Sequence, residues 1–153
     1  MINWTYNPED YGKIKPITPG QYRVRIESAE EQVSKTGRDM IKLTLKVSGQ
    51  NQLVYHYFVF LPDNPEMTND RLGRIFDSFG IKPGDLNVLN WKGKVGAAEI
   101  SNEPDNNGNL QSRVKFFIKR DKQGFLPAWQ ENPVRQATVN SEMVNPNSYE
   151  PPF

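Results

Sequence analysis

The clearest pattern in the chain is an alternation of apolar and polar positions that begins directly after Gly20. Tyr22, Val24 and Ile26 fall on one side, with Arg and Glu residues between them. This spacing predicts a β-strand with one buried face. The same alternation returns over residues 41–47, where every second residue is Ile, Leu or Val. Residues 29–39 between the two runs are expected to form a charged connection that turns at 35–37.

A third run, residues 53–61, is apolar on both faces and ends before Pro62. Either the side with Tyr55 and Tyr57 or the side with Phe58 and Phe60 could face the core. Tyrosine hydroxyls favour a position with access to water. We therefore expect the phenylalanines inside and the tyrosines outside.

Helical spacing replaces alternation after Pro62. Leu72, Ile75, Phe76 and Phe79 form one apolar stripe, with Thr68 or Asn69 as the expected N-cap and Gly80 as the expected stop. A fourth strand is predicted over about 94–101, a hairpin loop over 102–109 and a fifth strand over 110–120.

Alternation in the fifth strand places Val114, Phe116 and Ile118 on one face. The opposite face then carries Arg113, Lys115, Phe117 and Lys119.

Three strands, one helix and two further strands is the element order of an OB-fold. We therefore predict an all-β fold with one helix: a five-stranded OB-fold barrel, with the helix between strands 3 and 4. A small β-sandwich is the alternative. The domain is predicted over residues 1–135, and its first 20 residues form an irregular arm packed on the domain by Trp4, Tyr6 and Tyr11. Residues 136–153 have no periodicity and few apolar residues, so a disordered C-terminal tail is expected.

Composition argues against an enzyme. The chain has no cysteine and one histidine, His56, so thiol nucleophiles, thiolate metal sites and histidine-based triads lack their residues. Asp63, Glu66 and Asp70 could form a nuclease-type metal cluster, but helix capping and solvation account for them. We expect no catalytic residues, no metal and no cofactor. No apolar run reaches the ~18 residues of a membrane span, and no signal peptide is recognised, so a cytoplasmic location is expected.

The net charge of +1 is unevenly distributed. Residues 1–135 hold all 19 basic residues and 16 of the 18 acidic ones, hence +3, while Glu142 and Glu150 make the remainder −2. A mildly basic body is compatible with nucleic-acid binding.

Single-stranded nucleic acids are bound by cations that follow the phosphates and by aromatic rings on which bases stack. The predicted strands offer both. Phe117 is included because a core residue should not alternate in phase with lysines. Solvated surface charge is the competing explanation for the lysines, and Trp91 could stack on a base or, as we expect, fill one end of the barrel. Trp4 and Trp129 are assigned to packing. The candidate DNA-binding residues are Lys35, Arg38, Lys42, Lys46, Tyr55, Tyr57, Lys115, Phe117 and Lys119.

The stretches ITPGQYRVRI, KTGRDMIKLTLKV and RLGRIFDSFGI, after an N-terminal INW, resemble bacteriophage-type single-stranded DNA-binding proteins with small OB-fold domains. The resemblance spans about residues 2–120. It implies sequence-independent binding and protection of single-stranded DNA in phage replication, recombination or repair, in the host cytoplasm. A single-stranded RNA-binding domain and a protein-interaction adaptor remain alternatives.

The final residues, SYEPPF, resemble the terminal peptide of bacterial single-stranded DNA-binding proteins. That resemblance implies that Glu150, Pro152 and Phe153 bind replication or recombination proteins, although this chain has one acid where that family has several. The sequence leaves the oligomeric state open, a homo-oligomer included.

Overall fold

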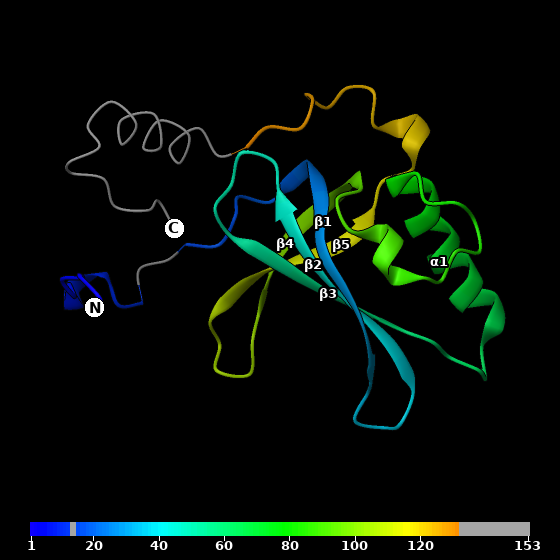
Figure 1. The fold of residues 1–153 in the computed structure, drawn as a ribbon, viewed down its shortest axis with the longest axis horizontal. Helices are drawn as coiled ribbons and strands as arrows, with labels where there is room; N and C mark the ends of the chain where they lie inside the picture. The colour runs from blue at the N-terminus through cyan, green and yellow to red at the C-terminus, as the bar shows by residue number, and fades with distance from the viewer. Residues whose placement is uncertain (13–14, 132–153) are drawn as a thin grey trace.

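The computed structural model describes residues 1–12 and 15–131 (Figure 1). The predicted tail, with Glu150, Pro152 and Phe153, lies outside the described residues. The elements follow in the order η1 (Pro8–Asp10), β1 (Gly20–Val33), β2 (Asp39–Val47), β3 (Leu53–Val59), α1 (Pro65–Phe79), η2 (Val88–Trp91), β4 (Val95–Pro104), β5 (Leu110–Phe117) and η3 (Arg120–Lys122).

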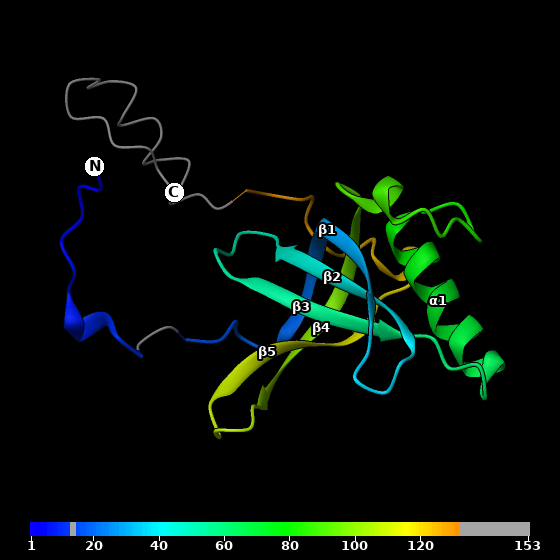
Figure 2. The same ribbon diagram turned by 60° about the horizontal axis from the view of Figure 1, so that its bottom comes forward.

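The five strands form one antiparallel sheet in the order β3-β2-β1-β4-β5. The sheet curls into a half-barrel, and its two edge strands, β3 and β5, contact each other without being neighbours in the hydrogen-bonded order. Figures 1 and 2 show α1 at one end of this curled sheet. The predicted class, mostly β with one helix between β3 and β4, is confirmed and is consistent with an OB-like fold. A sandwich of two sheets does not describe this single sheet.

The core lies on the concave side of the sheet and follows the alternation in β2. Ile41, Leu43, Leu45 and Val47 are all buried there, with Lys and Thr residues between them facing outward. In β3, Phe58 is buried, whereas Tyr55 and Tyr57 are exposed; Phe60, directly after the strand, packs against the core. The predicted orientation of β3 is therefore confirmed.

β1 is longer than predicted, because a bulge restores the alternation of inward and outward side chains in its second half. Ile26 pairs with Leu45 but Ser28 pairs with Thr44, so Glu27 has no partner in β2. The extra residue turns Ala29 toward the core, and the strand continues to Val33. The predicted long connection over 29–39 was wrong: the turn occupies only residues 34–38.

β5 contains a second bulge, and it exchanges the predicted positions of Phe116 and Phe117, whereas Val114 and Ile118 face the core as predicted. Glu99 pairs with Phe116 but Ile100 pairs with Val114, which leaves Lys115 without a partner in β4. As a result Phe117 is only 4% exposed and Phe116 is 38% exposed. The prediction of Phe117 as a DNA-stacking residue was wrong, because period-2 counting fails where one residue is inserted.

Helix α1 begins one turn earlier than expected. Asn64 is the N-cap, and its side chain accepts a hydrogen bond from the Met67 amide at 3.3 Å, so neither Thr68 nor Asn69 caps the helix. Pro65 suits the first position because its missing N–H has no helical partner there. The predicted apolar stripe is buried, and Gly80 ends the helix with a φ of 65°.

The C-terminal end of α1 packs directly on β4. A Cβ atom at Gly96 would lie 2.8 Å from both the carbonyl oxygen of Ser78 and a ring carbon of Phe79, so only glycine permits this approach. The buried Ser78 hydroxyl donates to the Ala97 carbonyl at 3.0 Å. The Gln123 side-chain amide donates to the carbonyls of Ser78 (3.1 Å) and Ile118 (2.8 Å), which ties helix, sheet and the following segment together.

Aromatic rings close the gap between β3 and β5. The Phe117 ring meets His56 of β3 edge to face at 5.0 Å between centroids, and it meets Phe79 of α1 at 5.4 Å. These contacts hold the two sheet edges together where no ladder of backbone hydrogen bonds joins them.

The three tryptophans have different environments. Trp91 is fully buried in the core and its indole N–H donates to the Asp85 carbonyl at 2.9 Å, so its ring is not open to a base. Trp129 is half-buried under the guanidinium of Arg25. Trp4, with Tyr6 and Tyr11, is exposed, so the prediction that the arm's aromatics pack on the domain was wrong.

The bulge in β5 generates a paired prediction. Phe117→Ala should lower the free energy of unfolding by about 3–5 kcal/mol, because it removes a buried ring and leaves a cavity. Phe116→Ala, one residue away, should change it by less than about 1 kcal/mol. Urea denaturation of the two variants checks this. Equal losses, or a larger loss for Phe116→Ala, would contradict the observed register.

Candidate nucleic-acid interface

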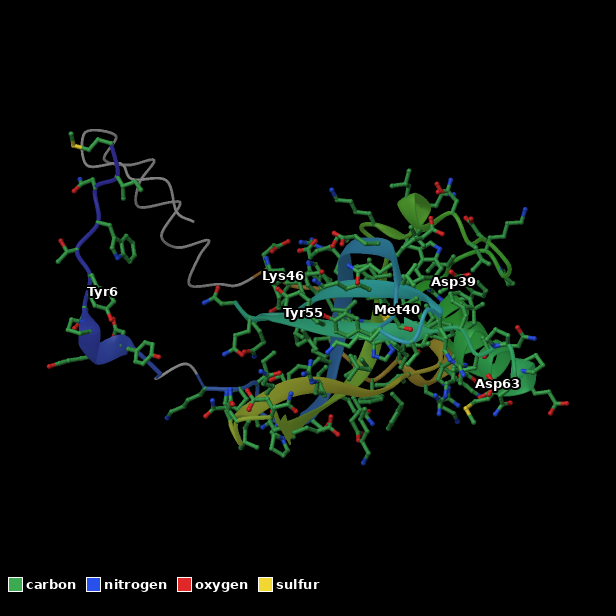
Figure 3. The ribbon with its side chains drawn as sticks, turned by 90° about the horizontal axis from the view of Figure 1, so that it is seen from below. Tyr6, Asp39, Met40, Lys46, Tyr55 and Asp63 are labelled. Atoms are coloured by element: carbon green, nitrogen blue, oxygen red, sulfur yellow. The ribbon has the colours of Figure 1, made fainter. Side chains whose placement is uncertain are left out.

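The outer face of β2 and β3 carries cations beside exposed rings. Lys42 is opposite Tyr57 in the register and Thr44 is opposite Tyr55. The Lys42 ammonium lies 4.9 Å from the centre of the Tyr55 ring, and Tyr57 is 47% exposed. Figure 3 shows Tyr55 on this strand pair. A cation held over one ring, beside a second free ring, can bind a phosphate and a base side by side.

A groove continues from this face across the gap between β3 and β5. It measures about 690 Å³ and is bounded by β3, β5 and α1; we call it the seam groove. Its polar and aromatic lining includes Tyr57, Arg71, Arg74, Lys115 and Phe116, with one acid, Asp70. Tyr57 thus belongs to both the outer face and the groove, which makes them one continuous surface.

The bulge in β5 explains why Lys115 and Phe116 both line the seam groove. In a regular strand these neighbours would point to opposite faces. Lys115 also pairs with Glu99 at 3.6 Å, but both groups are solvent-accessible, and such surface pairs are weak. The Lys115 side chain remains available to a phosphate.

His56 lies at the inner wall of the seam groove. Burial first, and then the positive charge of Arg71, lower the pKa of His56 from its ordinary 6.5 to about 4. The imidazole is therefore neutral at physiological pH, where it acts as a packing partner of Phe117.

Lys46 does not belong to the open part of this surface. Its ammonium donates to Glu131 at 2.6 Å, and its side chain is 13% exposed. Arg25 binds the other carboxylate oxygen of Glu131 at 2.8 Å. Hydrogen bonds from Lys46 and Arg25 hold the pKa of Glu131 at about 2, although burial opposes this. The assignment of Lys46 to DNA binding fails because a carboxylate already occupies it.

Residues 123–131 form a strap across the outer face of β1. Arg23 donates to the carbonyls of Pro127 (2.7 Å) and Gln123 (3.3 Å), and the Gln130 amide donates to the Ser48 hydroxyl at 2.9 Å. Together with the Glu131 pairs, these contacts cover the arginines of β1. The arginines of β1 are thus not part of the open basic surface, whereas Lys42 and the cations of the seam groove are.

The remaining predicted residues are more scattered. Lys35 is exposed at the β1–β2 turn, and Arg38 is held by an ion pair to Asp63 at 2.8 Å. The hydrogen bond from Arg38 is the main reason that the pKa of Asp63 lies below its usual range. Lys119 lies beyond the end of β5 and lines a neighbouring hollow with Arg74.

Sequence reasoning missed Arg71, Arg74 and Phe116. The two arginines are three residues apart on the polar side of the predicted helix, a spacing that puts them on one face. That signal was present, but the sheet edge that this face adjoins is a property of the tertiary structure.

A family model described as "Protein of unknown function (DUF669)" matches residues 5–127. The chain belongs to the DUF669 family. The match includes every strand, α1 and the whole seam groove, and it ends before Trp129 and Glu131 of the strap. No curated protein matches this DUF669 chain.

Residues 1–12 and 15–131 contain no group of three or more His, Cys, Asp or Glu side chains placed to hold a metal ion. In the same ranges, no helix has the length and apolar character that crossing a bilayer requires.

The position of His56, half-buried beside Phe117 and Arg71, predicts its titration. Because His56 is the single histidine of the chain, its imidazole proton signal in NMR spectra is unambiguous. We expect a pKa near 4 in the folded protein. The unfolded chain, with a pKa near 6.5, binds the proton first as the pH falls. Stability should therefore decrease between pH 6.5 and 4, by on the order of 2 kcal/mol at about pH 5, and His56→Leu should flatten this dependence. A measured pKa close to 6.5 would contradict the packing of His56 on Phe117.

Proposed function

We propose that this chain binds single-stranded DNA without sequence preference, through the outer face of β2 and β3 and the seam groove. The observation that supports this proposal most strongly is a continuous row of cations and rings. Lys42 lies over the ring of Tyr55, and Tyr57 is exposed beside it. The groove beyond Tyr57 adds further cations and the ring of Phe116. In OB-folds, the face of the second and third strands is where oligonucleotides bind. A five-stranded OB-fold barrel, opened between β3 and β5, is the fold we propose for this domain.

The basic and the aromatic side chains have different roles in this proposal. Lys42, Lys115, Arg71 and Arg74 neutralise phosphates, and Tyr55, Tyr57 and Phe116 stack on bases. Rings bind any base because every base has a flat face. Bases in a duplex are stacked on one another and are not accessible to these rings, so the surface selects single strands.

The biological role that we propose is protection of single-stranded DNA in phage replication, recombination or repair. It rests on the resemblance of residues 2–120 to phage single-stranded DNA-binding proteins. We add that Glu150, Pro152 and Phe153 recruit partner proteins, on the resemblance of the terminal peptide; these residues lie outside the described ranges.

Binding of labelled oligo-dT, followed by fluorescence anisotropy at two salt concentrations, tests the proposal. We expect tighter binding to oligo-dT than to a duplex of equal length, and an affinity that falls as salt rises because counterions are released. Competition with oligo-rU tests the alternative that RNA is the ligand. Equal affinity for duplex and single strand would contradict stacking as the basis of binding.

Two variants separate stacking from charge. Tyr57→Ala should weaken binding by about 1–3 kcal/mol with an unchanged salt slope, because it removes a ring and no charge. Lys42→Gln should weaken binding and reduce the salt slope by roughly 0.7, the value for one phosphate contact on a single strand. Lys92→Gln, an exposed lysine after η2, is the matched control and should have little effect. If Lys92→Gln weakens binding as much as Lys42→Gln, binding depends on net charge and not on this face.

A further inference from the structure

A second hollow adjoins the seam groove near the end of β5. It measures about 770 Å³ and is lined mainly by residues that follow β5, with Gln21 of β1 and Arg74 of α1; we call it the flank groove. Arg74 and Phe116 line both grooves. The two hollows therefore form one path that passes over Phe116.

The flank groove repeats the chemistry of the seam groove. Lys119 and Lys122 are exposed on its wall beside Arg74, with one acid, Asp121, among the lining residues. Among the described residues, no ion pair engages Lys119 or Lys122. Phe125 is 68% exposed and gives the groove an aromatic face of its own. Cations around a free ring are what a single-stranded nucleic acid requires.

The backbone around Phe125 is fixed on both sides. Before it, the buried Gln123 side chain donates to Ser78 and Ile118. After it, the Leu126 amide donates to the Gln123 carbonyl at 3.0 Å, and Arg23 donates to the Pro127 carbonyl at 2.7 Å. The exposed ring is thus carried by a short turn that the rest of the domain holds in place. Because the backbone is already fixed, little main-chain freedom is lost when a base stacks on this ring.

We propose that the flank groove is a second subsite for the same DNA strand: a base stacks on Phe125, and Arg74, Lys119 and Lys122 bind the phosphates around it. This inference rests on the proposed function and deepens it. The strand would leave the seam groove over Phe116 and continue past the end of β5. The binding site is then longer than the face of β2 and β3, and oligonucleotides too short to reach Phe125 bind without using it.

Affinity as a function of oligonucleotide length tests the subsite. The full-length protein and its Phe125→Ala variant are titrated with labelled oligo-dT of about 6 and about 16 nucleotides, a short and a long probe within the range for one OB domain. We expect Phe125→Ala to leave the affinity for the short probe unchanged and to weaken the long probe about fivefold or more. The double variant Lys119→Gln/Lys122→Gln should reduce the salt slope by roughly 1.4 for the long probe only.

Leu89→Ala is the matched control, because Leu89 is another exposed apolar side chain, on η2. It should leave both titrations unchanged, and thermal melts of all variants should coincide with the wild type. A wild-type protein that binds neither probe overturns the proposed function itself. The subsite alone is overturned if the wild-type protein binds both probes and Phe125→Ala does not separate them. That is the case if the variant binds the long probe as well as the wild type does, or if it loses affinity for both probes equally.

Discussion

The packing of Phe117 between His56 and Phe79 is the contact on which the candidate interface depends. The edge strands β3 and β5 are not hydrogen-bonded neighbours, so side chains must hold them together. The three rings do this from three elements: β3, β5 and α1. Because the edges meet through side chains and not through a ladder, a groove remains between them. His56 and Phe117 form its inner wall, and the residues next to them form the rest. Phe116, next to Phe117, faces that groove because of the bulge at Lys115.

The basic residues of this domain serve two different purposes. Arg23, Arg25 and Lys46 hold the strap, and the carboxylate of Glu131 bridges two of them. Breaking such a partly buried cluster would leave charges without partners, which is costly. Lys42, Arg71, Arg74 and Lys115 instead border open surface beside exposed rings. The small net charge of the chain hides this separation, and only the second group is suited to bind phosphates.

Helix α1 connects the core to the interface. Its apolar stripe is buried, and its end approaches β4 so closely that residue 96 must be glycine. The same approach fixes the angle of the helix, and with it the position of Arg71 and Arg74 on the wall of the seam groove. The helix that carries two of the groove's cations is thus the same helix that packs on β4 and, through Phe79, on Phe117.

The sequence by itself determined most of the elements and the orientation of the regular strands. Strict alternation identified the buried face of β2, and the preference of tyrosine for a wet surface oriented β3, which exposed Tyr55 and Tyr57 as expected. The apolar stripe and Gly80 located the body and the end of α1. These features are local, because each depends on periodicity or on the conformation of one residue.

The tertiary structure alone decided which charged and aromatic residues are open to a ligand. Bulges at Glu27 and Lys115 shift the phase of their strands, and no local signal marks them, so Phe117 and Phe116 exchanged places relative to the expectation. Lys46 was predicted to be free to bind DNA, yet its ammonium donates a hydrogen bond to Glu131, 85 residues later in the chain. Arg71 and Arg74 line the seam groove because the edge of β5, more than 35 residues away in the chain, lies beside their helix. Contacts between residues so distant in sequence arise from how the sheet curls, and alternation along a single strand carries no information about that.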